Sequence, residues 1–561
     1  MSTATPEPLI GVGVGRAAVV GPVALARPVP ALPPVEAPGT AADAARVRDV
    51  LAVVAGELAA RATTASGALA EVLEATAQMA EDPSLIADVE QRIAAGTGPA
   101  HAVHDAVEQV CAMFAAAGGY LAERVTDLRS VRDRVVARLL GLAEPGLPVL
   151  TEPSVVVAQD LSPADTSALD LALVLGIVTE LGGPTGHTAI IAGQLGLPCV
   201  VQVAGATALA PGTVVAVDAA AGTVLPDPDA ATVAAVDARR AAADRLARDV
   251  APGATADGHP VALLANIGTV ADAERAAAAG AEGVGLFRTE VLFLERQSAP
   301  TVAEQAEAYR AVLRTFAGHK VVVRTLDAGA DKPLAFARQA DEENPALGVR
   351  GYRLVRTAPE LLRDQLAALA EAQRDTGVDL WVMAPMIATV QEAAAFAAAA
   401  RAAGLTRPGV MVEVPAAALR AREVLTEVEF VSLGTNDLAQ YTMATDRLRG
   451  ELADLLDPWQ PAVLDLVAAT AGAGGETGRP VGVCGESASD PLMAVVLTGL
   501  GVTSLSMSTA AIPAVRAALR AHTLDECRAV AQAARGARTA EAARAAALDG
   551  VRQEVRDVLG L

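Results

Sequence analysis

The spacing of hydrophobic and polar positions changes several times along the 561 residues. Over residues 41–141, apolar side chains recur every three or four positions, as Val47, Leu51 and Val54 do, which is the period of an amphipathic helix. Pro83 interrupts the pattern between two such segments. We therefore expect a small bundle of helices in this part of the chain.

Residues 148–225 have a different pattern, in which short β-branched runs alternate with Gly and Pro. The runs PSVVVAQD, ALVLGIVTE, LPCVVQV and TVVAVDA each have the length and composition of a buried strand. The opening segment 9–26 is also strand-rich, and we expect it to join the same compact α/β domain, with the bundle as an insertion. A helix over 229–249, with Pro or Gly at both edges, is expected to link this half of the chain to the next.

From residue 258 onward, strand-like runs recur with helical stretches between them. Eight such β-then-α units in about 300 residues are typical of a closed (β/α)8 barrel. In that fold the chemistry lies at the carboxyl ends of the strands. The runs are 261–268, 280–287, 321–329, 380–387, 409–417, 430–438, 481–488 and 504–510.

Polar side chains collect at or just after the ends of these runs. Arginine presents a fork of donors that matches phosphate and carboxylate, and paired carboxylates suit Mg²⁺. A single polar residue at such a place could be a solvated loop residue, but several arginines beside two carboxylates indicate a site for a small phosphorylated anion with a hard divalent metal. The candidates are Asn266, Arg288, Arg324, Glu413, Asn436, Asp437, Arg447 and Cys484.

One histidine stands in a distinctive setting. His187 follows a Gly-rich turn in TELGGPTGHTAIIAG and precedes an apolar, helix-compatible run. Backbone N–H groups at a helix N-terminus hold phosphate oxygens well, and a neutral imidazole there could attack phosphorus. A surface or capping role is the ordinary alternative for a histidine of this kind.

Charge, cysteine content and hydrophobicity narrow the possible partners. The formal net charge is −22, which argues against nucleic acid and against an anionic membrane surface, because both attract clustered Lys and Arg. The four cysteines form no CxxC pair, so we expect neither a disulfide framework nor a zinc site, and we infer a reducing, cytoplasmic setting. No uninterrupted apolar run reaches the ~18 residues of a membrane span.

Taken together, the motifs of the second half resemble those of phosphoenolpyruvate–protein phosphotransferase, Enzyme I of the bacterial phosphotransferase system. The most specific are GAEGVGLFRTEVLFL, VRTLDAGADK, ENPALGVRGYR, MVEVPAA, SLGTNDLAQYT and VCGESASD. The resemblance extends over the whole chain and implies an α/β multidomain protein. Its implied parts are an α/β phosphohistidine (swivelling) domain at 1–28 and 142–226, an inserted helical subdomain that binds the carrier protein HPr at 29–141, a linker helix at 227–255 and a phosphoenolpyruvate-binding (β/α)8 TIM barrel at 256–561.

The resemblance also implies a reaction. A phosphoryl group would pass from phosphoenolpyruvate to His187 and then to a histidine of HPr, releasing pyruvate, as the first step of sugar uptake. Thr166 matches the threonine that orients the imidazole, and Cys484 matches the proton donor to the enolate. The residues matched to substrate binding are Arg288, Arg324, Asn436 and Arg447, and those matched to Mg²⁺ are Glu413 and Asp437. Members of the family commonly form homodimers through the barrel.

The chain departs from the family pattern at three positions. Gly186 and Gly193 stand where Ser and Arg are usual, and Thr76 stands where a His is usual. The two glycines support one alternative, a catalytically weakened paralogue that binds phosphoenolpyruvate or HPr as a regulator. A phosphoenolpyruvate synthase-like enzyme is another, although no segment is left to form its nucleotide-binding domain. A nitrogen-type paralogue would usually add an N-terminal sensory domain.

Overall fold

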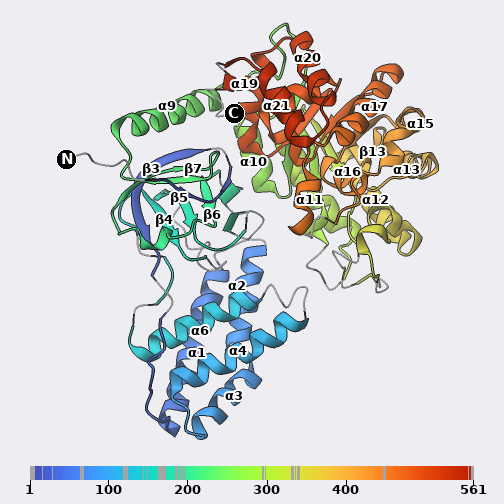
Figure 1. The fold of residues 1–561 in the computed structure, drawn as a ribbon. Coiled ribbons are helices and arrows are strands. Elements are labelled where there is room, and N and C mark those ends of the chain that lie inside the picture. The colour runs from blue at the N-terminus through green and yellow to red at the C-terminus, as the bar shows by residue number, and fades with distance from the viewer. Residues whose placement is uncertain are drawn as a thin grey trace. The chain divides into compact units, whose positions relative to one another are not determined.

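The computed structural model of the chain contains two compact units, residues 1–241 and 242–561 (Figure 1). Each unit has hydrophobic cores of its own. The residues that the structure describes are 7–15, 17–27, 30–63, 68–117, 124–142, 144–147, 150–161, 172–183, 188–189, 192–193, 196–293, 296, 298–329, 334, 336–337, 342–446, 450–553 and 555–556.

An eight-stranded sheet forms the α/β part of the first unit. Its strands lie in the order β1-β8-β7-β3-β4-β5-β6-β2. Strand β3 pairs parallel with β4 and antiparallel with β7, so the opening of the chain joins strands that follow the helical insertion, as the sequence predicted. The strands are β1 (Leu9–Ile10), β2 (Val12–Val14), β3 (Ala18–Leu25), β4 (Ser154–Ala158), β5 (Val174–Thr179), β6 (Cys199–Val201), β7 (Val214–Asp218) and β8 (Thr223–Pro226).

Helices make up most of the described residues between β3 and β4, as the apolar period predicted. Val47, Leu51 and Val54 are buried in the bundle core. The first helix begins at a capping box, in which the Thr40 side chain accepts from the Asp43 backbone N–H and the Asp43 carboxylate accepts in return. The helices are α1 (Ala41–Ala62), α2 (Ala68–Ala80), α3 (Pro83–Ala94), α4 (Pro99–Ala117) and α6 (Val125–Leu140), and a further helix, α9 (Ala230–Ala247), follows the sheet.

Eight parallel strands close into a barrel in the second unit. Each of the eight predicted runs coincides with one strand to within one residue or contains it, and several runs continue past the strand into a loop or helix. The strands are β9 (Ala262–Ile267), β10 (Gly283–Arg288), β11 (Lys320–Arg324), β12 (Asp379–Ala384), β13 (Pro408–Val412), β14 (Phe430–Leu433), β15 (Val481–Val483) and β16 (Ser504–Met507). The (β/α)8 barrel predicted from the sequence is confirmed.

Helices surround the barrel (Figure 1). Several begin at capping boxes of the Thr–x–x–acid type, as at Thr269 with Asp272 and Thr389 with Glu392. The helices are α10 (Val270–Ala278), α11 (Val302–Thr315), α12 (Pro359–Thr376), α13 (Val390–Ala402), α14 (Pro415–Leu419), α15 (Ala421–Glu427), α16 (Thr435–Thr442), α17 (Pro461–Thr477), α18 (Pro491–Gly499), α19 (Ile512–Arg520), α20 (Leu524–Arg535) and α21 (Ala540–Gly550).

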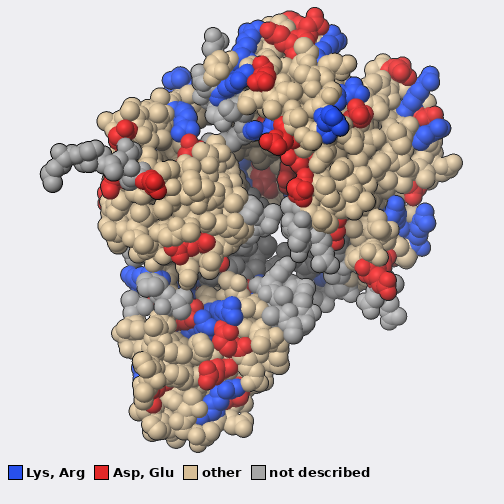
Figure 2. Space-filling model, viewed as in Figure 1, with Lys and Arg blue, Asp and Glu red and all other residues tan. Residues whose placement is uncertain are grey.

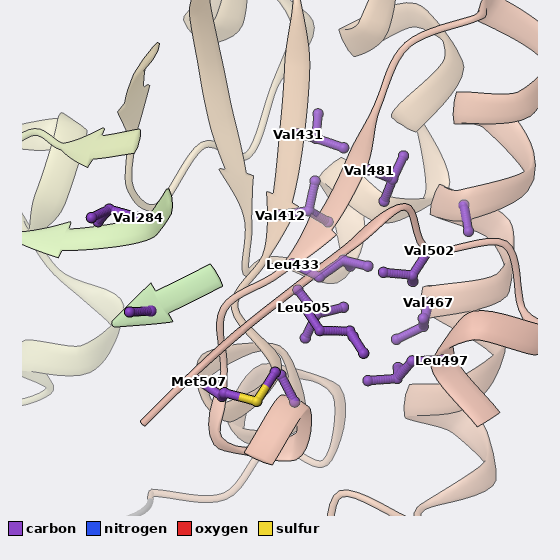
Figure 3. Close-up of a cluster of buried hydrophobic side chains, with 14 of the residues drawn as sticks. Val284, Val412, Val431, Leu433, Val467, Val481, Leu497, Val502, Leu505 and Met507 are labelled. Carbon is purple, nitrogen blue, oxygen red and sulfur yellow. The ribbon is translucent and has the colours of Figure 1, made fainter. Parts of the chain in front are cut away.

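Alternate side chains of each barrel strand point outward and pack against these helices. Figure 3 shows Val431, Val481 and Leu505, from three neighbouring strands, together with Val467 of α17 and Leu497 of α18. Because successive residues of a strand face opposite sides, the residues between the outward ones point into the barrel. The inward set therefore decides what the barrel interior can do.

Charges of both signs are interspersed over the face of the molecule in Figure 2. Ion pairs form between some of these charges, such as the half-exposed Arg129 of α6 and Glu108 of α4. Such exposed pairs contribute little to stability individually. Among the helices of the described ranges, none is long and apolar enough to cross a bilayer.

Candidate active site at the carboxyl end of the barrel

Six of the nine predicted site residues lie together at the carboxyl ends of the barrel strands. The two arginines Arg288 and Arg324 are the last residues of β10 and β11, and Glu413 and Cys484 directly follow β13 and β15. The other two, Asn436 and Asp437, stand in the first turn of α16 after β14. The remaining three predicted residues, His187, Thr166 and Arg447, lie outside the described residues.

Arg324 is buried at the bottom of this end and is held by two carboxylates. Its guanidinium donates to Glu290 at 2.5 Å and lies 3.3 Å from Asp327. Within the described part of the chain, its buried Nε has no hydrogen-bond partner. A buried donor of this kind is costly unless a ligand satisfies it, and the anionic group of a small substrate would do so.

A second buried arginine, which the sequence analysis did not assign, continues the network. Arg350 is 2 % exposed and its guanidinium contacts Asp327 at 3.2 Å and Asp437 at 3.2 Å. Charges therefore alternate from Glu290 through Arg324, Asp327 and Arg350 to Asp437. Arg350 and Asp327 both stand in motifs quoted for the family resemblance, ENPALGVRGYR and VRTLDAGADK, so a signal for them was present in the sequence.

Glu413 is a buried carboxyl whose pKa is shifted. Burial, and then the neighbouring Asp437 and Asp327, raise the pKa of Glu413 above its ordinary range. The Met386 backbone N–H donates to one of its oxygens at 2.8 Å. Met386 itself has a positive φ of 61°, which a non-glycine residue rarely adopts. In this backbone conformation its N–H group donates to the Glu413 carboxylate.

These acidic residues suit a magnesium ion. The neighbouring Asp437 carboxylate raises the pKa of the buried Glu413 carboxyl, and a cation bound between two such groups would offset that repulsion. Mg²⁺ prefers one or two carboxylates with water and phosphate as its other ligands. Among the described residues, no group of three or more His, Cys, Asp or Glu is arranged to hold a metal. Glu413 and Asp437 therefore fit a magnesium ion whose other ligands are water and substrate oxygens.

Cys484 is buried among the inward-facing residues of the barrel. Burial raises the pKa of its thiol to about 11, while a hydrogen bond from Ser432 opposes that effect. The Asn266 side-chain amide donates to the Cys484 carbonyl oxygen at 3.1 Å. At neutral pH the thiol therefore keeps its proton, as a group that donates a proton must.

The outer part of the site is more open. Arg288 and Asn436 are exposed, and the Asn436 side-chain oxygen accepts from the Glu486 backbone N–H at 3.1 Å. Open and buried donors thus lie at the carboxyl ends of several strands of the same barrel. Such a site can hold a small anion in contact with Arg324 while leaving it accessible from outside.

The first unit carries the other sequence departures. Thr76 is 3 % exposed within α2, so this side chain belongs to the bundle interior. Gly193 is exposed, and a Cβ added there would meet only Val14 at 3.9 Å. Among the described residues, none approaches Gly193 closely enough to require glycine there. Gly186 lies outside the described residues.

Three protein-family models match consecutive parts of the chain. A PEP-utilising enzyme N-terminal model matches residues 10–124, a PEP-utilising enzyme mobile-domain model matches 150–222, and a PEP-utilising enzyme PEP-binding domain matches 243–524. The last of these contains the barrel and the strand-end site. Fold and site together thus define a phosphoenolpyruvate-utilising enzyme.

Curated relatives narrow the family further. A phosphoenolpyruvate-protein phosphotransferase of Streptomyces coelicolor is 54 % identical over 96 % of this chain and 97 % of its own length. Proteins of the same name from Haloferax volcanii and Bacillus subtilis are 40 % and 38 % identical, over 92 % and 79 % of this chain and 94 % and 81 % of their own lengths. The chain belongs to the phosphoenolpyruvate–protein phosphotransferase family, and it is a transferase that uses phosphoenolpyruvate.

Proposed function

We propose that this enzyme transfers the phosphoryl group of phosphoenolpyruvate to its own His187 and then to a histidine of the carrier protein HPr, releasing pyruvate, as the first step of sugar uptake. The observation that carries the proposal is the meeting of Arg324, Glu413 and Cys484 at one end of the barrel, in a chain of this family. Their chemistry matches the anion binding, charge neutralisation and proton donation that the reaction needs.

The arginines hold the substrate in this proposal. Arg288, Arg324 and Arg447, with Asn436, bind the phosphate and carboxylate groups of phosphoenolpyruvate. The free Nε of Arg324 supports such a contact, because a guanidinium already fixed by Glu290 and Asp327 is pre-oriented for its ligand. A substrate bound by these residues already has its phosphorus oriented toward the nucleophile.

Glu413 and Asp437 would hold Mg²⁺. When bound, the ion supplies a positive charge that stabilises the phosphoryl and enolate oxygens as the phosphorus–oxygen bond breaks. Arg350 orients Asp437 through their 3.2 Å contact, so the metal ligand is fixed before substrate arrives. Asp327 in turn fixes Arg350.

Loss of the phosphoryl group leaves the enolate of pyruvate. His187 receives the phosphoryl group through an imidazole nitrogen that Thr166 orients, and Cys484 gives its thiol proton to the methylene carbon of the enolate. Protonation at carbon makes the step strongly downhill. A thiol whose pKa is raised to about 11 by burial stays protonated until the enolate forms.

The remaining parts of the proposal come from the family resemblance. The helical bundle, α1 to α4 with α6, would dock HPr, whose histidine is the next acceptor. Two copies of the chain would associate through their barrels, and the enzyme would act in the cytoplasm.

Intact-mass spectrometry tests the first half-reaction. The protein is mixed with phosphoenolpyruvate and Mg²⁺ and kept at neutral to alkaline pH, beside His187→Ala and, as a matched control, His104→Ala in the bundle. We expect one acid-labile phosphoryl group on the wild type and on His104→Ala, and none on His187→Ala. A wild type that binds phosphoenolpyruvate without gaining mass would contradict the proposal and favour a regulator.

A further inference from the structure

A buried glutamine contacts the strand ends that carry the two arginines of the site. Gln365 of α12 is 1 % exposed, and the other buried residues of that helix are leucines and alanines. Burying a side-chain amide is unfavourable unless its donors and its acceptor find hydrogen-bond partners. A glutamine at this place therefore requires an explanation.

The Gln365 amide makes three hydrogen bonds to neighbouring elements. Its oxygen accepts from the Leu326 backbone N–H at 2.9 Å, and its nitrogen donates to the Thr289 hydroxyl and to the Tyr309 hydroxyl, both at 3.0 Å. Because a backbone N–H can only donate, the contact with Leu326 identifies the oxygen of the amide. The NH₂ group must therefore face the two hydroxyls.

These contacts set the direction of the Thr289 hydroxyl. Its oxygen accepts from Gln365, and its single proton is donated to the Arg324 carbonyl oxygen at 2.9 Å. Thr289 directly follows β10, and Arg324 is the last residue of β11. The two hydrogen bonds thus join the ends of the two strands.

Arg324 is consequently held through both its main chain and its side chain. Thr289 binds its carbonyl oxygen, while Glu290 and Asp327 bind its guanidinium. Each of these two carboxylates directly follows a residue that the glutamine amide contacts. A shift of either backbone segment would therefore move a carboxylate that holds the guanidinium.

We propose that Gln365 is a positioning residue, which holds Arg324 in the orientation that binds phosphoenolpyruvate. The inference rests on the proposed role of Arg324 in substrate binding. A fully hydrogen-bonded network in a buried setting restricts its members to one arrangement. An arginine that is fixed before its ligand arrives loses less conformational entropy on binding. Gln365 thus acts on the substrate through Arg324.

The same network supplies a matched control at its far end. Gln305 of α11 is also buried, at 2 % exposed, and its amide accepts from the Tyr309 hydroxyl and donates to the Pro300 carbonyl oxygen. Neither partner belongs to a strand end of the barrel. Replacing Gln305 therefore removes a buried amide of the same kind while the contacts of Gln365 with both strand ends remain.

Titration calorimetry of the full-length protein with phosphoenolpyruvate and Mg²⁺ measures the affinity, and denaturant unfolding measures the stability. All variants carry His187→Ala, which removes the proposed acceptor, and this parent is the reference. Gln365→Met and Gln305→Met should both lower the denaturant midpoint, because each loses buried hydrogen bonds. Only Gln365→Met should weaken binding, by about tenfold or more. Unchanged binding in Gln365→Met, or an equal loss in both variants, would overturn the positioning role.

A smaller change tests the same link without removing the amide. Thr289→Val lacks the hydroxyl at nearly constant volume and should weaken binding, whereas Thr289→Ser keeps the hydroxyl and should bind as the parent does. Parent-like binding by Thr289→Val would contradict the link to Arg324.

Arg324→Lys separates this inference from the proposed function. If Arg324→Lys binds phosphoenolpyruvate as tightly as the parent, the proposed role of the arginine is wrong. If it binds more weakly, Gln365→Met added to it should weaken binding by less than about twofold further, because both changes act on one contact. A full additional loss would show that Gln365 does not act through Arg324.

Discussion

Glu413 is expected to bind its metal ion in competition with a proton. Burial first, and the nearby Asp437 and Asp327 next, raise the pKa of its carboxyl. A carboxyl with a raised pKa holds a proton closer to neutral pH, and Mg²⁺ must displace that proton to bind. The affinity for Mg²⁺ is therefore expected to rise as pH rises through this pKa, by up to about tenfold per pH unit.

Titration calorimetry with Mg²⁺ at about pH 6.5 and about pH 8.5 measures this dependence. Glu413→Gln has no proton to displace and should lose both the pH dependence and most of the affinity. Glu541→Gln, at an exposed position of α21, is the matched control and should follow the wild type. Equal wild-type affinities at the two pH values would show that Glu413 is ionised throughout or that it does not bind the metal.

The four cysteines have similar burial and similar thiol pKa values where these are given, and they differ mainly in their position in the fold. All four are buried, and burial raises the pKa of Cys199 and Cys527 to about 12 and that of Cys484 to about 11. Their acidity hardly distinguishes them. Cys484 differs because it follows β15 at the end of the barrel where Arg324 lies, and its strand run with the VCGESASD motif made that placement predictable. Without the strand run and the motif, Cys484 would be better interpreted as a small buried residue of the core.

At the scale of elements, a chain of buried charges ties together β11, the 3-10 helix η4 (Gly351–Arg356) with Arg350 before it, and α16. Removing one member of a buried network leaves the others desolvated without a partner, which costs more than the pair contributes. We expect Arg350→Ala to lower the free energy of unfolding of the barrel by about 3–5 kcal/mol, because Asp327 and Asp437 both lose a contact.

Denaturant unfolding followed by tryptophan fluorescence measures this loss selectively, since both tryptophans, Trp381 and Trp459, lie in the second unit. Arg356→Ala is the matched control. Its guanidinium is 70 % exposed and lies 3.5 Å from Glu392, and a pair of this kind contributes less than about 1 kcal/mol. Losses of similar size in both variants would mean that the buried network does not hold the barrel end.

The barrel elements were predictable where a local pattern encodes them. Each strand is a short apolar run in the sequence, so all eight strands were predicted. The boundary was less predictable in the run 430–438, which contains both β14 and the start of α16, because apolar residues continue from the strand into the helix. The role of Arg350 was missed for a different reason. Its partners Asp327 and Asp437 are distant in sequence and meet it only after the chain folds. The roles of His187, Thr166 and Arg447 remain predictions.

At the scale of the whole molecule, each of the two units has hydrophobic cores built from its own described residues. The large core around the barrel contains residues from Val261 onward, while the cores of the bundle and the sheet contain none beyond Val224. Burial of apolar area is the main favourable term in folding, so each unit has its own source of stability. A unit of this kind is expected to fold without the other.

The fragment 230–561, which begins with α9 and includes the barrel, tests this expectation. We expect it to unfold in one cooperative transition at the denaturant midpoint that tryptophan fluorescence reports for the barrel in the full chain, because the same core is buried in both. It should bind phosphoenolpyruvate with Mg²⁺ in calorimetry and gain no phosphoryl group, since the proposed acceptor His187 is absent. A fragment without a cooperative transition would show that the barrel depends on the first unit. A folded fragment that still became phosphorylated would place the acceptor in the barrel, and the assignment of His187 would be wrong.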